Sequence, residues 1–148
     1  MRHSILPALL FLLPPLSANS AYQGREYNTW YEKDAVLYDL VQTSTGQPVM
    51  LSFSQPGQDQ ANLVISEVSV GECKTSRLLR VNGHVVPAGY VCARLGKDQV
   101  EHFTVTDAGQ VNNMVHLLQS DFTLLLQGDI KVWAANVKNP KYGVAPHF

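Results

Sequence analysis

The chain has few charged residues and no marked excess of either sign. Only 16% of its 148 residues are Asp, Glu, Lys or Arg, and the formal net charge is −1. An average soluble domain has about 25% charged residues, so uncharged polar side chains must cover much of the surface, as in many exported β-rich proteins. Without a basic excess the chain has no general attraction for nucleic acid or anionic lipid. The sequence therefore argues against a nucleic-acid partner.

The chain also lacks the motifs of common catalytic sites. It has no Gly-x-Ser-x-Gly nucleophile elbow, no Ser-x-x-Lys pair and no glycine-rich phosphate loop. No spacing singles out a carboxylate pair among the candidate acids. These acids are Asp39, Glu67, Glu101, Asp107 and Asp129. We therefore expect no catalytic residue and no cofactor.

Histidines with the close spacing of metal ligands are missing as well. Those outside the N-terminal segment are His84, His102, His116 and His147. We therefore expect no metal site. The alternative, an unrecognised hydrolase, would need two or more of a small set of side chains to converge in one cleft. That set is Glu67, His84, Glu101, His102 and His116.

The first twenty residues have the pattern of a secretory signal peptide. Arg2 precedes an apolar run over 5–16 that only prolines interrupt, and the small residues Ala18 and Ser20 stand where a signal peptidase reads. The run is too short and too rich in proline to span a bilayer. We expect cleavage after residue 20 and a mature protein that is periplasmic or secreted.

Cysteine is scarce, and its use fits that compartment. Cys73 and Cys92 are the only two, and in an oxidising compartment their simplest state is a disulfide. Such a bridge would stabilise the fold by about 3 kcal/mol on the chain-entropy model. Redox enzymes usually carry their thiols as Cys-x-x-Cys, whereas these are nineteen positions apart in β-like sequence. We expect a structural bridge.

Alternating apolar and polar residues predict strands over most of the chain. The clearest turn signal is Asn82-Gly83, because both residues tolerate the positive φ of a type I′ hairpin turn. The last predicted strand, 130–137, is apolar on both faces and should be central or covered on both sides, by a helix or by the second copy of a homodimer. The predicted strand segments are a hairpin over 36–54, a strand over 61–70, a hairpin over 78–86, strands over 90–92 and 100–106, and a hairpin over 122–137.

One helix is predicted, over about 107–119. Asp107 can cap its N-terminus, with Gln110 at the capping-box position. Apolar residues then follow at helical spacing. The expected fold is α+β and mostly β: a curved antiparallel sheet, or an open barrel-like sheet, packed by this helix. We expect one domain over 21–138 and a C-terminal tail over 139–148.

We expect a non-catalytic binding protein that acts on another exported or envelope protein, as an inhibitor, an immunity factor or an accessory subunit of an envelope or secretion assembly. A hairpin stapled by a disulfide suits this role because it holds a loop in its bound shape and so loses less entropy on docking. The candidate binding residues are Arg80, Asn82, Gly83 and His84 on the hairpin, flanked by Trp30 and Tyr31.

A concentration of aromatic residues over 22–38 has two interpretations. The rings either form a half-exposed strip that contacts a partner or a sugar, or they close the core at the end of the sheet. A second function class is a carrier of a lipid, a sugar or an aromatic compound. Its pocket would be lined by Trp30, Tyr38, Phe53 and Trp133.

Overall fold

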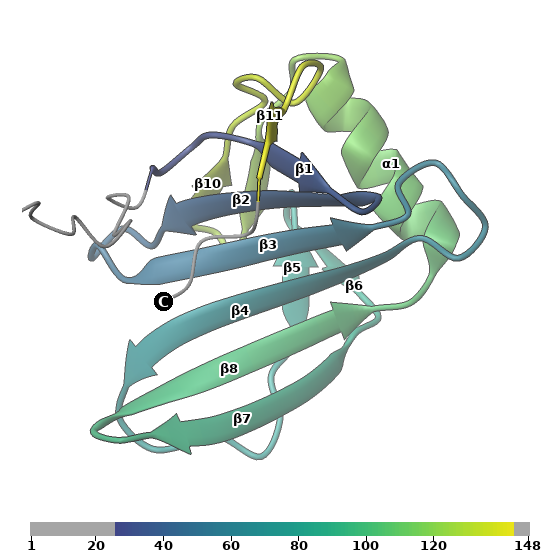
Figure 1. Cartoon of the computed structure of the whole chain (residues 1–148). Coiled ribbons are helices and arrows are strands. Elements are labelled where there is room, and N and C mark those ends of the chain that lie inside the picture. Colours follow the sequence, from purple (N-terminus) through teal and green to yellow (C-terminus); the bar gives the residue numbers. More distant parts are fainter. Residues whose placement is uncertain (1–25, 144–148) are drawn as a thin grey trace, which may run out of the picture.

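The computed structural model describes residues 26–143, and the expected signal peptide lies outside them. Within this range the strands form two sheets, accompanied by one helix (Figure 1). The predicted fold class is confirmed: the fold is mostly β, with a single helix and a sheet that does not close into a barrel. The predicted bridge between Cys73 and Cys92 is present.

The larger sheet has seven strands, with β11 and β7 at its two edges. Neighbouring strands pair antiparallel except β1 and β11, which run parallel. The strands in spatial order are β11 (Lys141–Tyr142), β1 (Tyr31–Lys33), β2 (Val36–Gln42), β3 (Pro48–Ser54), β4 (Asn62–Val70), β8 (Asp98–Val105) and β7 (Gly89–Leu95).

The smaller sheet has four short strands and lies behind the larger one in Figure 1. It joins two hairpins that are distant in the sequence, one from each side of the helix. The strands in spatial order are β10 (Ile130–Val132), β9 (Leu124–Leu126), β5 (Leu79–Val81) and β6 (His84–Val86).

Helix α1 (Ala108–Gln119) begins where the sequence predicts. The Asp107 side chain accepts a hydrogen bond from the backbone N–H of Gln110 at 3.1 Å, which satisfies one of the free donors of the first turn. The apolar stripe of the helix is buried: Val111, Met114, Val115 and Leu118. These side chains belong to one apolar cluster with residues of both sheets, so the core is shared by all three layers.

The predicted last strand, 130–137, is wrong in its length and its position. The observed strand, β10, ends at Val132 and lies at an edge of the smaller sheet. The chain leaves the strand because its next backbone groups bond elsewhere: the Trp133 carbonyl accepts from the Trp30 indole N–H at 2.9 Å. A turn follows, in which the Val137 N–H donates to the Ala134 carbonyl.

The segment expected to be a tail also contributes a strand. Residues 141–142 form β11, which pairs with β1. The Lys141 N–H donates to the Trp30 carbonyl at 3.0 Å. A two-residue strand has no periodicity to read, so only the available edge of β1 reveals it.

Candidate functional site

The predicted hairpin is present, and its tip is only partly available to a partner. Asn82 and Gly83 have φ of 51° and 81°, as a type I′ turn requires. Asn82, however, is committed within the fold. Its N–H donates to the Leu125 carbonyl at 2.8 Å, and its side-chain oxygen accepts from the Leu125 N–H at 2.9 Å. Arg80, Asn82, Gly83 and His84 are all exposed, but the Asn82 N–H and side-chain oxygen are already bonded to β9.

Trp30 is a core residue rather than part of an exposed strip. Its side chain is fully buried and lies 5.9 Å from the Phe53 ring, centroid to centroid. The Asn136 side chain makes two hydrogen bonds to the Trp30 backbone. It accepts from the Trp30 N–H at 2.7 Å and donates to the Trp30 carbonyl at 3.0 Å. In this structure Trp30 cannot contact a partner, so the core interpretation holds for this ring.

Tyr31 is half-buried and lies on the larger sheet, whereas the hairpin belongs to the smaller one. Its hydroxyl donates to Glu26 Oε2 at 2.6 Å, and this bond raises the pKa of Tyr31 to about 12. Lys141 Nζ contacts the same carboxylate oxygen at 3.0 Å. Tyr31 therefore takes part in a local polar contact between β1 and β11.

Two of the candidate carboxylates do converge. Glu67 on β4 and Glu101 on β8 are directly opposite in the register, and both approach Arg77. Arg77 Nη1 lies 2.6 Å from Glu101 Oε2 and 3.6 Å from Glu67 Oε2. The Tyr90 hydroxyl donates to the other Glu101 oxygen at 2.5 Å. We call these four side chains the Arg77 cluster.

Burial raises the pKa of two groups in the Arg77 cluster, Glu67 and Tyr90. Desolvation raises the pKa of Glu67, and the nearby Arg77 guanidinium opposes that shift. Desolvation and the Glu101 hydrogen bond raise the pKa of Tyr90 to about 12. Glu101 itself is buried and fully engaged by Arg77 and Tyr90. Both Glu101 oxygens already have a hydrogen-bond partner, an arrangement typical of a structural ion pair.

The histidines do not join these carboxylates. The His102 ring lies on the opposite face of the sheet from Glu101, where its Nδ1 is 2.7 Å from the Ser66 hydroxyl oxygen. His84 is at the hairpin tip and His116 is on the helix. Among residues 26–143, no three or more His, Cys, Asp and Glu side chains are grouped so that they could hold a metal ion.

The disulfide positions Arg77. Cys92 on β7 is directly opposite Glu101 in the register, and the bridge to Cys73 brings the 71–78 connection to this side of the sheet. Arg77 then reaches Glu101 and places its guanidinium carbon 5.5 Å from the centroid of the Phe103 ring. The connection is therefore fastened at two points, the disulfide and Arg77.

The sheet edge at β7 carries an exposed apolar surface that the sequence analysis did not single out. Val70, Val91 and Leu95 are 74%, 63% and 61% exposed. The register places them on the face opposite to Glu101, with Val68, Val100 and Ala93 in the row between them. Within the described part of the chain, β7 pairs with β8 alone. Val70 lies on β4, and Asp98 of β8 separates it from Leu95. We call Val91, Leu95 and the unpaired edge of β7 the β7 patch.

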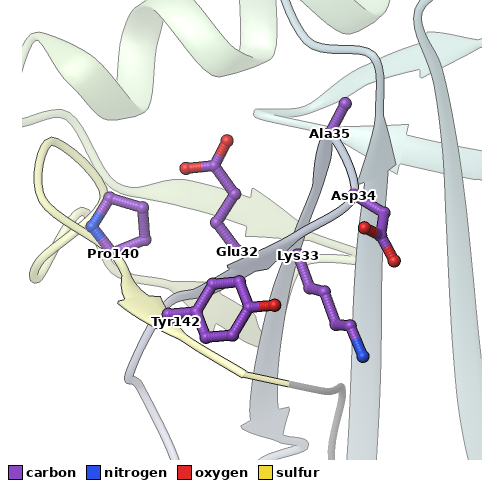
Figure 2. Close-up of a pocket in the computed structure, with 6 residues that line it drawn as sticks. All are labelled: Glu32, Lys33, Asp34, Ala35, Pro140 and Tyr142. Atoms are coloured by element: carbon purple, nitrogen blue, oxygen red, sulfur yellow. The ribbon is translucent and has the colours of Figure 1, made fainter.

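Two surface pockets have charged side chains in their lining. Figure 2 shows the first, of about 270 Å³, which lies beside the β1–β2 turn and Tyr142. The second, of about 350 Å³, is lined by residues 28, 42–44, 129, 131 and 133. We call it the Trp133 pocket.

The four aromatic residues expected to line the pocket of a carrier do not form an interior pocket. Trp30 and Phe53 pack against each other in the core. Tyr38 points to the opposite face of β2 from the buried Leu37, and Trp133 is 45% exposed. These rings therefore do not enclose a common space, although Trp133 lines a pocket at the surface.

Comparisons with protein-family models, with curated proteins and with solved structures found no match for this chain. Between residues 26 and 143 no helix has the length and apolar character needed to cross a membrane.

Proposed function

We propose that this chain is a non-catalytic binding protein, periplasmic or secreted, that acts on another exported or envelope protein through the β7 patch. The partner supplies an extended segment that pairs with β7 as a further strand. The observation that carries this proposal is an unpaired sheet edge beside two large apolar side chains, Val91 and Leu95, each more than 60% exposed.

The chemistry of the β7 patch favours an extended, partly apolar segment. An edge strand presents a row of backbone donors and acceptors, and proteins usually protect such an edge with charge, proline or a bulge. Arg94 is the only charged residue of β7, and it lies on the other face from Val91 and Leu95. A partner strand would pair with the backbone and place alternate apolar side chains beside Val91 and Leu95.

The Arg77 cluster and the disulfide support the same role. They hold β7 from the face that the partner does not contact, so little conformational freedom is lost on docking. The disulfide is also compatible with a protein that works outside the reducing cytosol. The role as inhibitor, immunity factor or accessory subunit would depend on the activity of the partner.

The test is capture of a partner by a mature chain that begins at Ala21, compared with two variants. Val91→Glu places a charge on the β7 patch, and Phe122→Glu makes the same change at a similarly exposed apolar side chain beyond the helix. We expect the wild type and Phe122→Glu to retain a stoichiometric partner from the native envelope fraction and Val91→Glu to lose it. Hydrogen exchange on the complex should show slower exchange at the amides of 89–95.

Two results would overturn the β7 assignment. One is a partner that Val91→Glu retains, with no change in exchange at 89–95. The other is loss of binding in His84→Ala, which would move the contact to the predicted hairpin. A concentration-dependent dimer in sedimentation velocity, abolished by Val91→Glu, would show that a second copy of the chain occupies the edge instead.

A further inference from the structure

The Trp133 pocket lies away from the β7 patch and combines an aromatic ring with hydrogen-bonding groups. Strands β3, β4 and β8 separate β2, whose last residue lines the pocket, from β7. The pocket of about 350 Å³ is formed where the β2–β3 turn meets the β9–β10 turn and the residues after β10. The lining residues come from three segments of the chain, at positions 28, 42–44 and 129–133.

The Trp133 ring stands on a fixed backbone. The Trp133 carbonyl accepts from the buried Trp30 indole, and Asn136 holds the Trp30 backbone on both sides. The Trp133 side chain makes none of these bonds and is 45% exposed. The indole is thus presented at the surface as a half-exposed apolar platform on a hydrogen-bonded backbone.

The polar groups around this platform are of both kinds, donors and acceptors. The Ser44 hydroxyl donates to Asp129 Oδ2 at 2.9 Å, which orients the carboxylate, and Asp129 Oδ1 takes no part in that bond. Lys131 supplies a cationic donor whose Nζ lies over one face of the Trp133 ring, 5.8 Å from the centroid, so a sugar ring would pack on the other face of the indole. The amide groups of Asn28 and Gln42 can each donate and accept.

We propose that the Trp133 pocket binds a saccharide through one sugar ring. A pyranose ring has an apolar C–H face, which would pack on the indole, and an edge of hydroxyl groups, which both donate and accept. Neighbouring hydroxyls would donate to Asp129 and accept from Lys131, while the amides complete the hydrogen bonding. A lipid is a poorer fit, because Trp133 is the only large apolar side chain of the lining.

This proposal goes beyond the protein-binding function and uses a separate set of residues. It gives the chain a second contact, with a glycan of the cell envelope or of a partner. The pocket is open, so a single ring can be held while the rest of a longer glycan extends into solvent. The occupant is defined by its chemistry: a ring with adjacent hydroxyls and one apolar face.

The test uses the mature chain on an array of immobilised neutral and acidic oligosaccharides, followed by titration of any saccharide that binds. We expect binding that shifts tryptophan fluorescence. We expect Trp133→Ala and Asp129→Asn each to weaken it by about tenfold or more, since each removes an interaction made directly with the sugar. Tyr142→Ala is the matched control, because Tyr142 is an exposed aromatic side chain outside the pocket.

Failure of this proposal is distinguishable from failure of the protein-binding function. Val91→Glu should bind the saccharide as the wild type does, and Trp133→Ala should still capture the protein partner. No saccharide bound by the folded protein would overturn the proposal. So would a saccharide that binds Trp133→Ala unchanged, or one that Tyr142→Ala loses equally.

Discussion

At the scale of single residues, Asp39 is unusual because its acidic side chain is fully buried among apolar residues. It lies on the core face of β2 with Leu37 and Val41, opposite Leu51 of β3. Both carboxylate oxygens are buried without a hydrogen-bond partner among the described residues. Burial raises the pKa of Asp39 to about 7. The backbone amides of Leu40 and Thr29 lie near enough to oppose this rise, but not in hydrogen-bond geometry.

The raised pKa predicts a stability that falls as pH rises. The unfolded chain releases this proton near pH 4, whereas the folded chain keeps it up to about pH 7. The free energy of unfolding should therefore decrease between about pH 4 and pH 7 by at most about 4 kcal/mol from this group, and then level off. Urea unfolding across this range would measure it.

The variant Asp39→Asn isolates this contribution. Because the amide cannot ionise, Asp39→Asn should remove most of the decrease and be more stable than the wild type at pH 8. Asp59→Asn, at an exposed position, is the control for loss of one negative charge. If Asp39→Asn is the less stable protein at pH 8, the assignment of a buried, protonated carboxyl is wrong.

Arg77 provides the second prediction at this scale. Arg77→Met leaves Glu101 buried without its counter-charge, which should lower the free energy of unfolding by about 2–4 kcal/mol, allowing for the partial exposure of Arg77. The double variant Arg77→Met/Glu101→Met should recover part of the loss, because the buried Glu101 charge is removed together with its partner and only Glu67, which lies farther from Arg77 at 3.6 Å, loses its counter-charge. Arg94→Met, at an exposed arginine of β7, should change little. A double variant no more stable than Arg77→Met would contradict this account.

At the scale of elements, the 71–78 connection joins the two sheets, since it leads from β4 to β5. Cys73→Ser/Cys92→Ser should lower stability by about 3 kcal/mol on the chain-entropy model. Removing the disulfide also frees the segment that carries Arg77. The losses of stability caused by the disulfide variant and by Arg77→Met should therefore be partly the same loss. Urea unfolding of the triple variant should give less than the sum of the two losses. Strict additivity would mean that the disulfide does not position Arg77.

The edge strands belong to this scale too. Val91, Ala93 and Leu95 alternate with other side chains in the sequence, a pattern that indicates a strand but not its neighbours. The structure places β7 at an edge and leaves Val91 and Leu95 open. For the same reason the apolar sequence of 130–137 suggested a covered strand, whereas β10 is a short edge strand. Pairing partners come from distant segments, so a local pattern cannot assign them.

At the scale of the whole molecule, one core serves both sheets and the helix. This shared core separates the two proposed binding surfaces, because the β7 patch and the Trp133 pocket lie at different parts of the larger sheet. Each surface is stiffened from within, the first by the Arg77 cluster and the second by Trp30. On the two proposals above, the chain would make both contacts at its surface, each beside residues that are held within the fold.

The amino-acid sequence by itself determined the features that depend on neighbouring residues. Asn82-Gly83 makes the predicted turn, Asp107 caps the predicted helix, and alternation places most strands within a few residues of their observed limits. Each of these is set by backbone preference or a contact within about one turn of chain. The pairing of Cys73 with Cys92 also follows from the sequence, because there is no other cysteine to choose.

Only the tertiary structure decided which of these residues are available to a partner. It buries Trp30, commits Asn82 to β9 and brings Arg77 to Glu101. It also leaves the β7 edge open and assembles the Trp133 pocket from three separate segments. The physical reason is that burial, strand order and side-chain convergence depend on contacts between residues far apart in the chain. No short window of sequence contains both partners of such a contact.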